Sequence, residues 1–165
     1  MELLRKFNKK LDAILRWLLS GAFAVMILVV FLQVLNRNVI GVSLVWTLDV
    51  AQLMFSWCIF IGAALAVRWD EHYTLTLTPK SWNVVNSLIT IISYIGSMIV
   101  VAVMGINGWQ FTGMGLTQTS TGLEISMLWF FLPIPLGAAA MACFLAELIP
   151  DELKLIRDLH WGNRS

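Results

Sequence analysis

Residues 34–72 read VLNRNVIGVSLVWTLDVAQLMFSWCIFIGAALAVRWDEH, and this stretch indicates the fold of the whole chain. It holds the end of one apolar run, a short connector with Arg37 and Gly41, and a second apolar run that carries Asp49 and closes at Arg68. An aspartate inside a membrane-length run costs roughly 3 kcal/mol on insertion scales. Asp49 is therefore predicted to face protein or water rather than lipid.

The composition places the chain among integral membrane proteins. Of its 165 residues, 59% are apolar and 13% are charged, and the mean hydropathy is +0.80. A soluble domain of this size cannot hide so much apolar surface in its core. The charges lie at the ends of the apolar runs rather than along one face, so no nucleic acid partner is expected. Cys58 and Cys143 lie inside apolar runs, where no disulfide framework is expected.

Four apolar runs are long enough to cross about 30 Å of hydrocarbon, which takes roughly 20 helical residues. The predicted transmembrane helices are residues 17–35, 44–67, 84–106 and 127–148. With short connectors between them, they predict a single all-α membrane domain over residues 1–165 that ends in a cytoplasmic tail at 149–165. The first run is longer than the core of a signal peptide, so we expect a retained span rather than a cleaved leader.

The amino-terminal segment, residues 1–16, has the pattern of an amphipathic helix. Leu3, Phe7, Leu11 and Ile14 recur at helical spacing, and basic residues lie elsewhere on the helical wheel. The pattern predicts a helix that lies in the bilayer interface. A cytoplasmic lead-in that simply continues into the first span fits the same residues, and the two arrangements can coexist.

The distribution of lysine and arginine predicts the orientation of the spans. Ten of the 11 basic residues lie on one side of the predicted membrane: Arg5, Lys6, Lys9, Lys10, Arg16, Arg68, Lys80, Lys154, Arg157 and Arg164. The other side has Arg37, and the long connector at 107–126 has no basic residue. Because cytoplasmic loops carry the excess of lysine and arginine, both termini are expected to be cytoplasmic.

Polar stripes follow the second and third spans. At about 100° per residue, one narrow sector of the second span holds Asp49, Gln52, Ser56 and Ala63. The third span has a similar stripe of small and weakly polar residues: Asn86, Thr90, Ser93, Ser97 and Gly108. Such side chains allow close helix approach and interhelical hydrogen bonds, so we interpret both stripes as helix contacts rather than as a path for a solute.

The fourth span is predicted to be distorted in its first half. Pro133 and Pro135 each remove a backbone donor, and Gly137 lets another helix come close. Tryptophans lie near the predicted span ends, where indole rings prefer the interface: Trp17, Trp46, Trp69, Trp82, Trp109 and Trp129. We expect them to serve mostly as lipid-interface anchors.

Motifs for catalysis or cofactor binding are absent from the sequence. Both histidines, His72 and His160, lie outside the predicted spans, which excludes a membrane cytochrome with two axial histidines. The sequence has neither a GxxxxGKS or GxxxxGKT loop for ATP nor clustered metal ligands. We therefore expect no enzyme and no cofactor in this chain. Asp70, Glu71 and His72 are interpreted as a solvated helix end, with a contact to a partner's loop as the alternative.

Two blocks of sequence carry a family resemblance. The first comprises Asn36, Arg37, Gly41, Ser43, Leu44, Trp46, Asp49, Gly62, Ala63, Ala64, Arg68 and His72. The second comprises Leu123, Ile125, Trp129, Pro135 and Gly137. With these blocks the chain resembles, over nearly its whole length, the small membrane subunit of tripartite ATP-independent periplasmic (TRAP) transporters. It departs from the family pattern at Leu48 and Thr76, where members often have an acid, and at Ser126, where they often have proline.

The resemblance implies a transporter component rather than a complete transporter. It implies a small scaffolding subunit in the bacterial inner membrane, in an obligate heterodimer with a large elevator-type permease subunit. In such systems a periplasmic solute-binding protein docks transiently and delivers an organic acid anion, such as a C4-dicarboxylate or sialic acid. Sodium ions, expected on the large subunit, drive the import.

The resemblance and the polar stripes together predict an interface with the large subunit. Its predicted residues are Arg37, Trp46, Asp49, Gln52, Ser56, Ala63, Arg68 and His72. Asp49 is expected to bond either Arg37 across the connector or a donor on the large subunit. The spans show no cluster of charges and no pair of broken half-helices, which favours a scaffold.

Two other functions fit a small membrane protein. A self-contained multidrug-type exporter needs an acidic residue in the middle of a span, usually the first, and residues 17–35 have none. A membrane anchor for an enzyme complex would be distinguished by the proteins encoded beside it.

Overall fold

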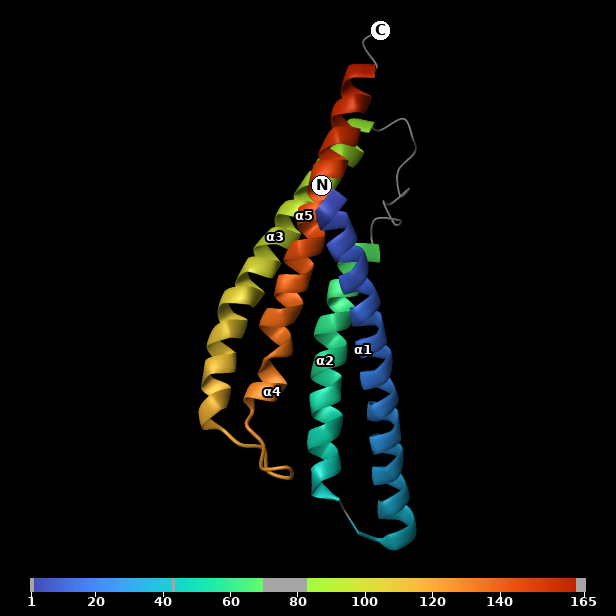
Figure 1. Ribbon diagram of the computed structural model, residues 1–165, viewed down its shortest axis with the longest axis vertical. Helices are drawn as coiled ribbons and strands as arrows, with labels where there is room; N and C mark the ends of the chain where they lie inside the picture. The colour runs from blue at the N-terminus through green and yellow to red at the C-terminus, as the bar shows by residue number, and fades with distance from the viewer. Residues whose placement is uncertain (1, 43, 70–82, 163–165) are drawn as a thin grey trace.

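The computed structural model describes residues 2–42, 44–69 and 83–162, and nearly all of them are helical (Figure 1). The elements are α1 (Glu2–Leu35), the π-helical turn η1 (Asn36–Ile40), α2 (Val45–Trp69), α3 (Asn83–Met114), the short turn η3 (Gly115–Thr117), α4 (Leu128–Phe131) and α5 (Pro133–Gly162). Four segments are long and apolar enough to cross a membrane: Leu4–Ile40, Val45–Trp69, Ile92–Thr117 and Leu128–Leu148. The prediction of an all-α protein with four transmembrane helices is confirmed.

The first span and the segment before it form one continuous helix, α1. Residues 1–16 are thus not set apart as an interfacial helix of their own, and the lead-in that continues into the span is the arrangement found from Glu2 onward. The side chains of Asn8 and Asp12 give the reason, because they are 0% and 3% exposed and face α5 and α2 instead of water. The segment also lacks a proline that would end the helix.

Two helices extend beyond the predicted spans. α3 continues past residue 106 to Met114, and α5 continues through Pro150 to Gly162. The tail predicted at 149–165 is therefore helical over its described part. Residues 152–157, ELKLIR, are mostly strong helix formers, which favours a helix that continues outside the hydrocarbon.

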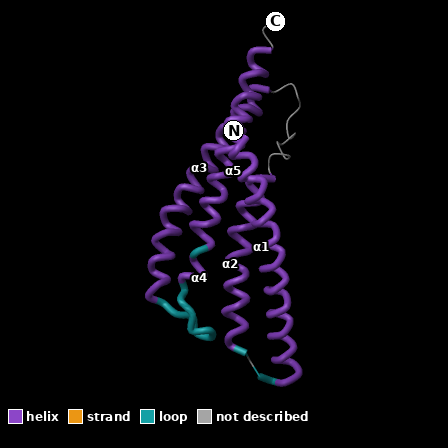
Figure 2. The backbone as a smooth tube through the Cα atoms, viewed as in Figure 1, coloured by secondary structure: helices purple, strands orange, loops and turns teal. Residues whose placement is uncertain are grey.

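The helices pack as a row in the order α1, α2, α5 and α3 (Figure 1). The last helix inserts between the second and the third, so α1 and α3 are the two outermost helices of the row. Figure 2 shows that the loop between α3 and α4 lies at the end of the row opposite the amino terminus. The outer helices expose large apolar side chains, such as Phe31 on α1 and Ile99 on α3, as expected of faces that meet lipid or another membrane subunit.

The buried core lies along α5. Ala140, Met141 and Phe144 of α5 pack against Ala64 of α2. Partly buried side chains from α1, α2 and α3 surround this cluster: Leu11, Leu15, Ala63, Val67, Val101 and Met104. Small residues on α5 alternate here with large ones, so that three helices meet around it without a wide gap.

Glycines bring α5 close to both of its neighbours. A Cβ atom on Gly137 would lie 2.9 Å from Phe60 Cβ of α2, and one on Gly108 of α3 would lie 2.7 Å from Ile134 Cγ2. The close approach predicted at Gly137 is thereby confirmed. The stripe predicted on the third span is not a continuous contact within this chain, because Ser93 is exposed although Gly108 is buried.

The hydrogen bonding of the fourth span is interrupted between α4 and α5, as the prolines predict, although Leu132 keeps helical φ and ψ. Pro133 has no N–H to donate to the carbonyl of Trp129, which a regular helix would require. Instead, Trp57 Nε1 of α2 donates to Trp129 O at 3.3 Å, and Ser56 Oγ donates to Phe130 O at 2.7 Å. Side chains of α2 therefore satisfy the carbonyls that the break exposes.

Candidate functional site

Clusters of polar contacts lie at both ends of the long helix axes, one near the amino terminus of α1 and one at the opposite end. At the end farther from the amino terminus, Asp49 lies one turn into α2, and its Oδ2 accepts hydrogen bonds from the backbone N–H groups of Gly122 at 2.8 Å and Leu123 at 2.9 Å. Charge-assisted bonds of this kind are about twice as strong as neutral ones. One carboxylate therefore fixes the connector between α3 and α4 onto α2.

Residues 118–127 of that connector form a hairpin, which we call the outer hairpin. Ser120 N donates to Ile125 O at 2.8 Å, and Met127 N donates to Gln118 O at 2.9 Å. At its tip Glu124 adopts a left-handed φ of 55°, which is uncommon for a residue with a side chain. The two backbone hydrogen bonds across the hairpin hold this turn closed.

Gly122 allows the outer hairpin to reach α2. A Cβ atom at this position would lie 2.9 Å from both the N and the Cα atom of Trp46. Backbone atoms cannot move aside as a flexible side chain can, so a larger residue would push the hairpin away from Asp49. The glycine and the carboxylate thus act on the same contact.

The second cluster, which we call the basic-end cluster, joins Asn8, Asp12, Arg16, Arg68 and Glu147. Asn8 Nδ2 donates to Cys143 O at 3.0 Å and to Glu147 Oε2 at 2.6 Å. Arg16 pairs with Asp12 one turn away on α1. Arg68 Nε lies 3.8 Å from Asp12 Oδ1, and Arg68 Nη1 lies 3.7 Å from Glu147 Oε2. Polar groups therefore join α1, α2 and α5.

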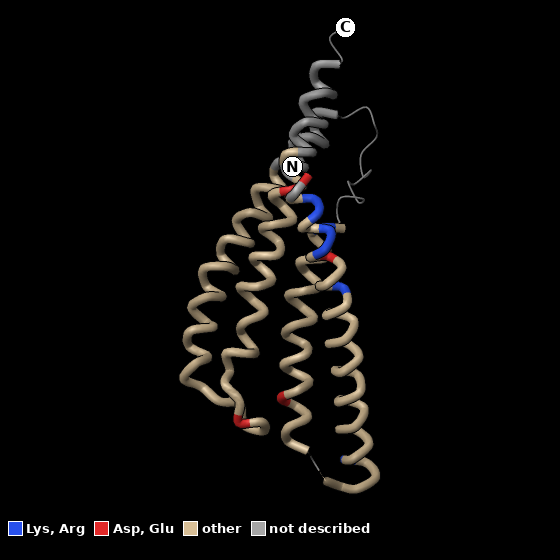
Figure 3. The backbone as a smooth tube through the Cα atoms, viewed as in Figure 1, with Lys and Arg blue, Asp and Glu red and all other residues tan. Residues whose placement is uncertain are grey.

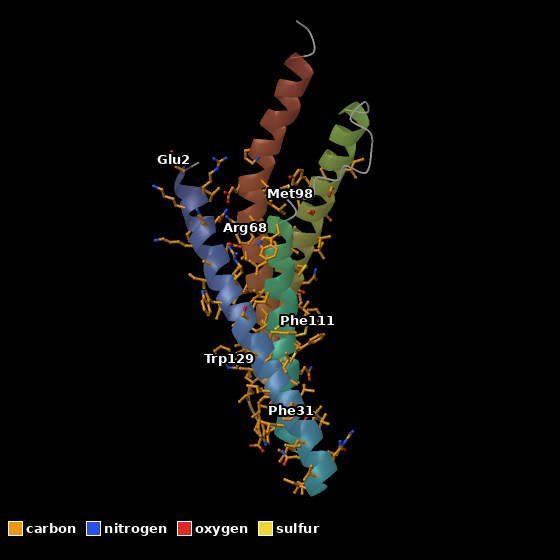
Figure 4. The ribbon with its side chains drawn as sticks, turned by 90° about the vertical axis from the view of Figure 1, so that its right-hand side faces the viewer. Glu2, Phe31, Arg68, Met98, Phe111 and Trp129 are labelled. Atoms are coloured by element: carbon orange, nitrogen blue, oxygen red, sulfur yellow. The ribbon has the colours of Figure 1, made fainter. Side chains whose placement is uncertain are left out.

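Arg68 lies where these three helices come together (Figure 4). Its guanidinium lies over the ring of Phe144, 5.1 Å from the centroid. Separations of 3.7 and 3.8 Å exceed hydrogen-bond length, so Arg68 attracts Asp12 and Glu147 by charge. The basic-end cluster has two carboxylates and two guanidiniums, so each charge in it lies near a charge of opposite sign.

The described charges of both signs gather toward the amino-terminal end of α1 (Figure 3). They lie at the ends of the membrane-length segments and not in the middle, which agrees with the prediction for the spans except at the basic end. There, Glu147 lies inside the predicted fourth span and joins Asp12 and Arg68, which lie just outside the spans predicted at 17–35 and 44–67. Glu147 and Arg68 lie close to the helix ends predicted at 148 and 67.

Arg37, one of the two donors predicted for Asp49, is not the donor found, and a donor on the large subunit stays a prediction. Asp49 is bound by two backbone amides of its own chain, whereas Arg37 is exposed on η1. A carboxylate with two oxygens can be satisfied by amides of a tight loop as well as by a cation. The sequence does not indicate this, because Gly122 and Leu123 are 73 and 74 residues away.

The other predicted interface residues fall into two groups. Ser56, Ala63 and Arg68 face their own chain, in contact with the helix break, the core around α5 and the basic-end cluster. Trp46 and Gln52 are exposed. Trp46, Gln52 and Arg37 therefore remain predicted contacts with a partner subunit. His72 lies outside the described residues.

The described tryptophans near the span ends are exposed, as interface anchors would be. They are Trp17, Trp46, Trp69, Trp109 and Trp129. Arg16 lies over the ring of Trp69 at 5.7 Å. Trp82 lies outside the described residues. The role of these side chains in lipid anchoring remains a prediction.

Sequence reasoning missed Asn8, Asp12 and Glu147. Asn8 and Asp12 are one turn apart, on the same face as Leu11 and Leu15, which is a signal that this face is buried. Glu147 lies inside the predicted fourth span, where an ionisable residue calls for a partner. Within the part of the chain that the structure describes, no group of three histidine, cysteine or acidic side chains is arranged to hold a metal ion.

Comparison with known families identifies a match over most of the chain. The family model described as "Tripartite ATP-independent periplasmic transporters, DctQ component" matches residues 26–154. The matched region contains Asp49, the outer hairpin, Arg68 and Glu147, whereas Asn8 and Asp12 precede it. No curated protein matches the chain. The family is one of transporter components and not of enzymes, which agrees with the expectation from the sequence.

Proposed function

The chain belongs to the family of DctQ components of tripartite ATP-independent periplasmic transporters, and from this premise we propose that it is the stationary scaffold of a binding-protein-dependent importer. In this role it holds the large membrane subunit in place while that subunit moves the solute. The protein is a multi-pass membrane protein and a component of a transporter that does not use ATP.

The observation that carries this proposal is that polar contacts join the helices at both ends of their long axes. Asp49 joins the outer hairpin to α2, and the basic-end cluster joins α1, α2 and α5. Polar side chains that could line a solute path, such as Ser56, instead bond the backbone of the same chain. Elements bound at both ends resist tilting, which is the property that a moving transport domain requires of its support.

The proposed partner surfaces follow from the open row of helices. α1 and α3 expose apolar side chains along their outward faces, and one of these faces suits a large membrane subunit while the rest suits lipid. Arg37 on η1 and Trp46 and Gln52 on α2 are exposed, and Trp46 lies beside Gly122 of the outer hairpin, so we propose that they extend that surface. We place this end of the row in the periplasm, because ten of the 11 basic residues belong to the other side.

The transported solute is proposed to be an organic acid anion, such as a C4-dicarboxylate or sialic acid. The proposed location is the bacterial inner membrane, with sodium ions bound by the large subunit. The outer hairpin is held by backbone hydrogen bonds and lies at the proposed periplasmic end, which suits a docking site for the solute-binding protein. Residues that select the solute are expected on the other two components.

Reconstitution in sealed liposomes tests the proposal. The chain alone, the large subunit alone and the two together are each supplied with sodium, the binding protein and radiolabelled succinate or N-acetylneuraminate. We expect uptake by the pair, little uptake by the large subunit alone, and none by this chain alone. The uptake should continue without ATP and stop when the sodium gradient is collapsed.

Two outcomes would overturn the proposal. Uptake by the purified chain alone would return the self-contained exporter to first place. Equal uptake by the large subunit with and without this chain would show that no scaffold is needed. A pair that takes up solute without sodium would retain the scaffold and remove the proposed coupling.

A further inference from the structure

Three lysines form an exposed stripe on the amino-terminal part of α1. Lys6, Lys9 and Lys10 are exposed, and two turns further along the helix Trp17 is 82% exposed. At 3.6 residues per turn, Lys6, Lys10 and Trp17 project within about 40° of one another. We call these four residues the lysine stripe.

The basic-end cluster fixes the direction of the lysine stripe. Asn8 and Asp12 lie on the side of α1 opposite Lys6, Lys10 and Trp17, where they are buried against α5 and α2, and Lys9 lies on the flank between the two sides. A rotation of α1 would break the hydrogen bonds of Asn8 and separate the Asp12 carboxylate from Arg68. The stripe therefore points away from the rest of the described residues, toward whatever surrounds the row of helices.

The length of α1 places the lysine stripe at the level of lipid headgroups. Residues 18–35 contain no charged side chain and span about 27 Å, close to the thickness of roughly 30 Å of the hydrocarbon. Trp17 then lies at the boundary of the hydrocarbon, where indole rings prefer to be. Lys10 lies about 10 Å and Lys6 about 16 Å further out, and their flexible stems let the ammonium groups reach the phosphate level.

The charges on the lysine stripe need an anion. Like charges three and four residues apart on a helix disfavour one another. Glu2, which is exposed one turn before Lys6, can offset one of the three ammonium groups. Among the described residues of α1, Asp12 is the other acid, and it pairs with Arg16 and Arg68. The described acids of α1 thus leave the charge of at least two lysines uncompensated.

We propose that the lysine stripe is a binding site for anionic phospholipids of the leaflet at the basic end. The ammonium groups of Lys6, Lys9 and Lys10 contact the phosphates, and the Trp17 ring lies beside the glycerol backbone. The charge is complementary to that of phosphatidylglycerol, and each basic residue near an anionic surface strengthens binding about fivefold. The site goes beyond the scaffold role, because it makes the position of the scaffold in the membrane depend on lipid charge.

Native mass spectrometry of the full-length chain, alone and with the large subunit, tests this site. Samples in mixed micelles receive equal amounts of phosphatidylglycerol and phosphatidylcholine with the same acyl chains. We expect the wild-type protein to retain phosphatidylglycerol preferentially, and the K6Q/K9Q/K10Q variant to lose at least tenfold of that preference. K6R/K9R/K10R should keep it, and Arg37→Gln, a charge removed at the other end of α1, should not change it.

Helical circular dichroism and cysteine accessibility at Thr117 confirm that the variants keep their fold and orientation. An unchanged lipid preference in K6Q/K9Q/K10Q would overturn the proposal. So would a variant that retains the lipid preference but no longer co-purifies with the large subunit, because the stripe would then be a contact with an acidic protein surface. Loss of the preference in Arg37→Gln would show a response to net charge and not a site.

Discussion

Asp49 and Gly122 are 73 residues apart in the sequence, yet Asp49 Oδ2 accepts a hydrogen bond from the Gly122 N–H group at 2.8 Å. This contact joins α2 to the connector that follows α3. In the row of helices, α3 otherwise packs mainly against α5. The Asp49 carboxylate therefore attaches α3 to the other helices a second time, through the outer hairpin and α2.

Substitutions at Asp49 should separate its charge from its hydrogen bonds. Asp49→Leu leaves the N–H groups of Gly122 and Leu123 without their acceptor, and bonds to charged groups contribute about 1.5–3 kcal/mol each. We expect the free energy of unfolding to fall by roughly 3 kcal/mol in Asp49→Leu and by about 1 kcal/mol in Asp49→Asn, whose amide oxygen still accepts. Denaturant unfolding followed by circular dichroism measures both.

Gln52→Leu is the matched control, since Gln52 is exposed nearly one turn further along α2. Hydrogen exchange should speed up in the outer hairpin of Asp49→Leu and remain at the wild-type rate in Gln52→Leu. If the two leucine variants exchange at the same rate, the carboxylate does not hold the hairpin.

Gly122→Ala should weaken the same contact by a steric route. Its Cβ atom would lie 2.9 Å from backbone atoms of Trp46, so the outer hairpin must shift away from Asp49. We expect a lower unfolding temperature, with an energetic loss of about 1–3 kcal/mol. Gly113→Ala is the control, because nothing lies within 4 Å of its Cβ position and it should be neutral or stabilising. Thermal unfolding of both variants in one detergent makes the comparison, and equal temperatures would refute the steric argument.

The four spans could be predicted from the sequence because their cause is local. A run of about 20 apolar residues cannot remain in water and has to form a helix in lipid. The break before Pro133 was likewise predictable, since a missing N–H group is a property of one residue. The packing order α1, α2, α5, α3 could not be predicted, because all four helices are apolar around much of their circumference and hydropathy does not distinguish their neighbours.

The candidate site was predictable in part. The polar stripe on α2 correctly indicated helix contacts at Ser56, and the cost of a charge in lipid correctly indicated that Asp49 has a partner. The identity of that partner depends on a turn formed by backbone amides, and an amide carries no signature in the sequence. Glu147 could have been found by applying the argument made for Asp49 to the fourth span.

Cysteine labelling should establish the orientation of the row. In a Cys58→Ala, Cys143→Ala background, single cysteines at Lys9 and at Thr117 occupy exposed positions near opposite ends. Because lysine and arginine concentrate on the side of Lys9, a membrane-impermeant maleimide added to intact spheroplasts should label Thr117→Cys and not Lys9→Cys. Permeabilised cells, in which both should react, are the control. Labelling of Lys9→Cys from outside would reverse the orientation.

The last prediction concerns Arg68, which lies between the two carboxylates of the basic-end cluster. Arg68→Met leaves Asp12 and Glu147 close together, with Arg16 as the remaining cation of the cluster. Removal of one member of a buried charge group costs about 3–5 kcal/mol, because the remaining charge is desolvated without compensation. We expect Arg68→Met to lower the yield of folded protein and to reduce the free energy of unfolding by about 3 kcal/mol. Arg68→Lys keeps the charge, so its free energy of unfolding should fall by less.

A triple variant, Arg68→Met with Asp12→Asn and Glu147→Gln, distinguishes charge from packing. It removes both carboxylates with the arginine, and the amide at position 147 keeps an acceptor for Asn8. Arg16 is half-exposed, so water can solvate it once its partner on α1 is neutral. If uncompensated charge causes the loss in Arg68→Met, the triple variant should recover at least half of the lost stability in the same denaturant experiment. A triple variant less stable than Arg68→Met would instead assign the role of Arg68 to its packing over the Phe144 ring.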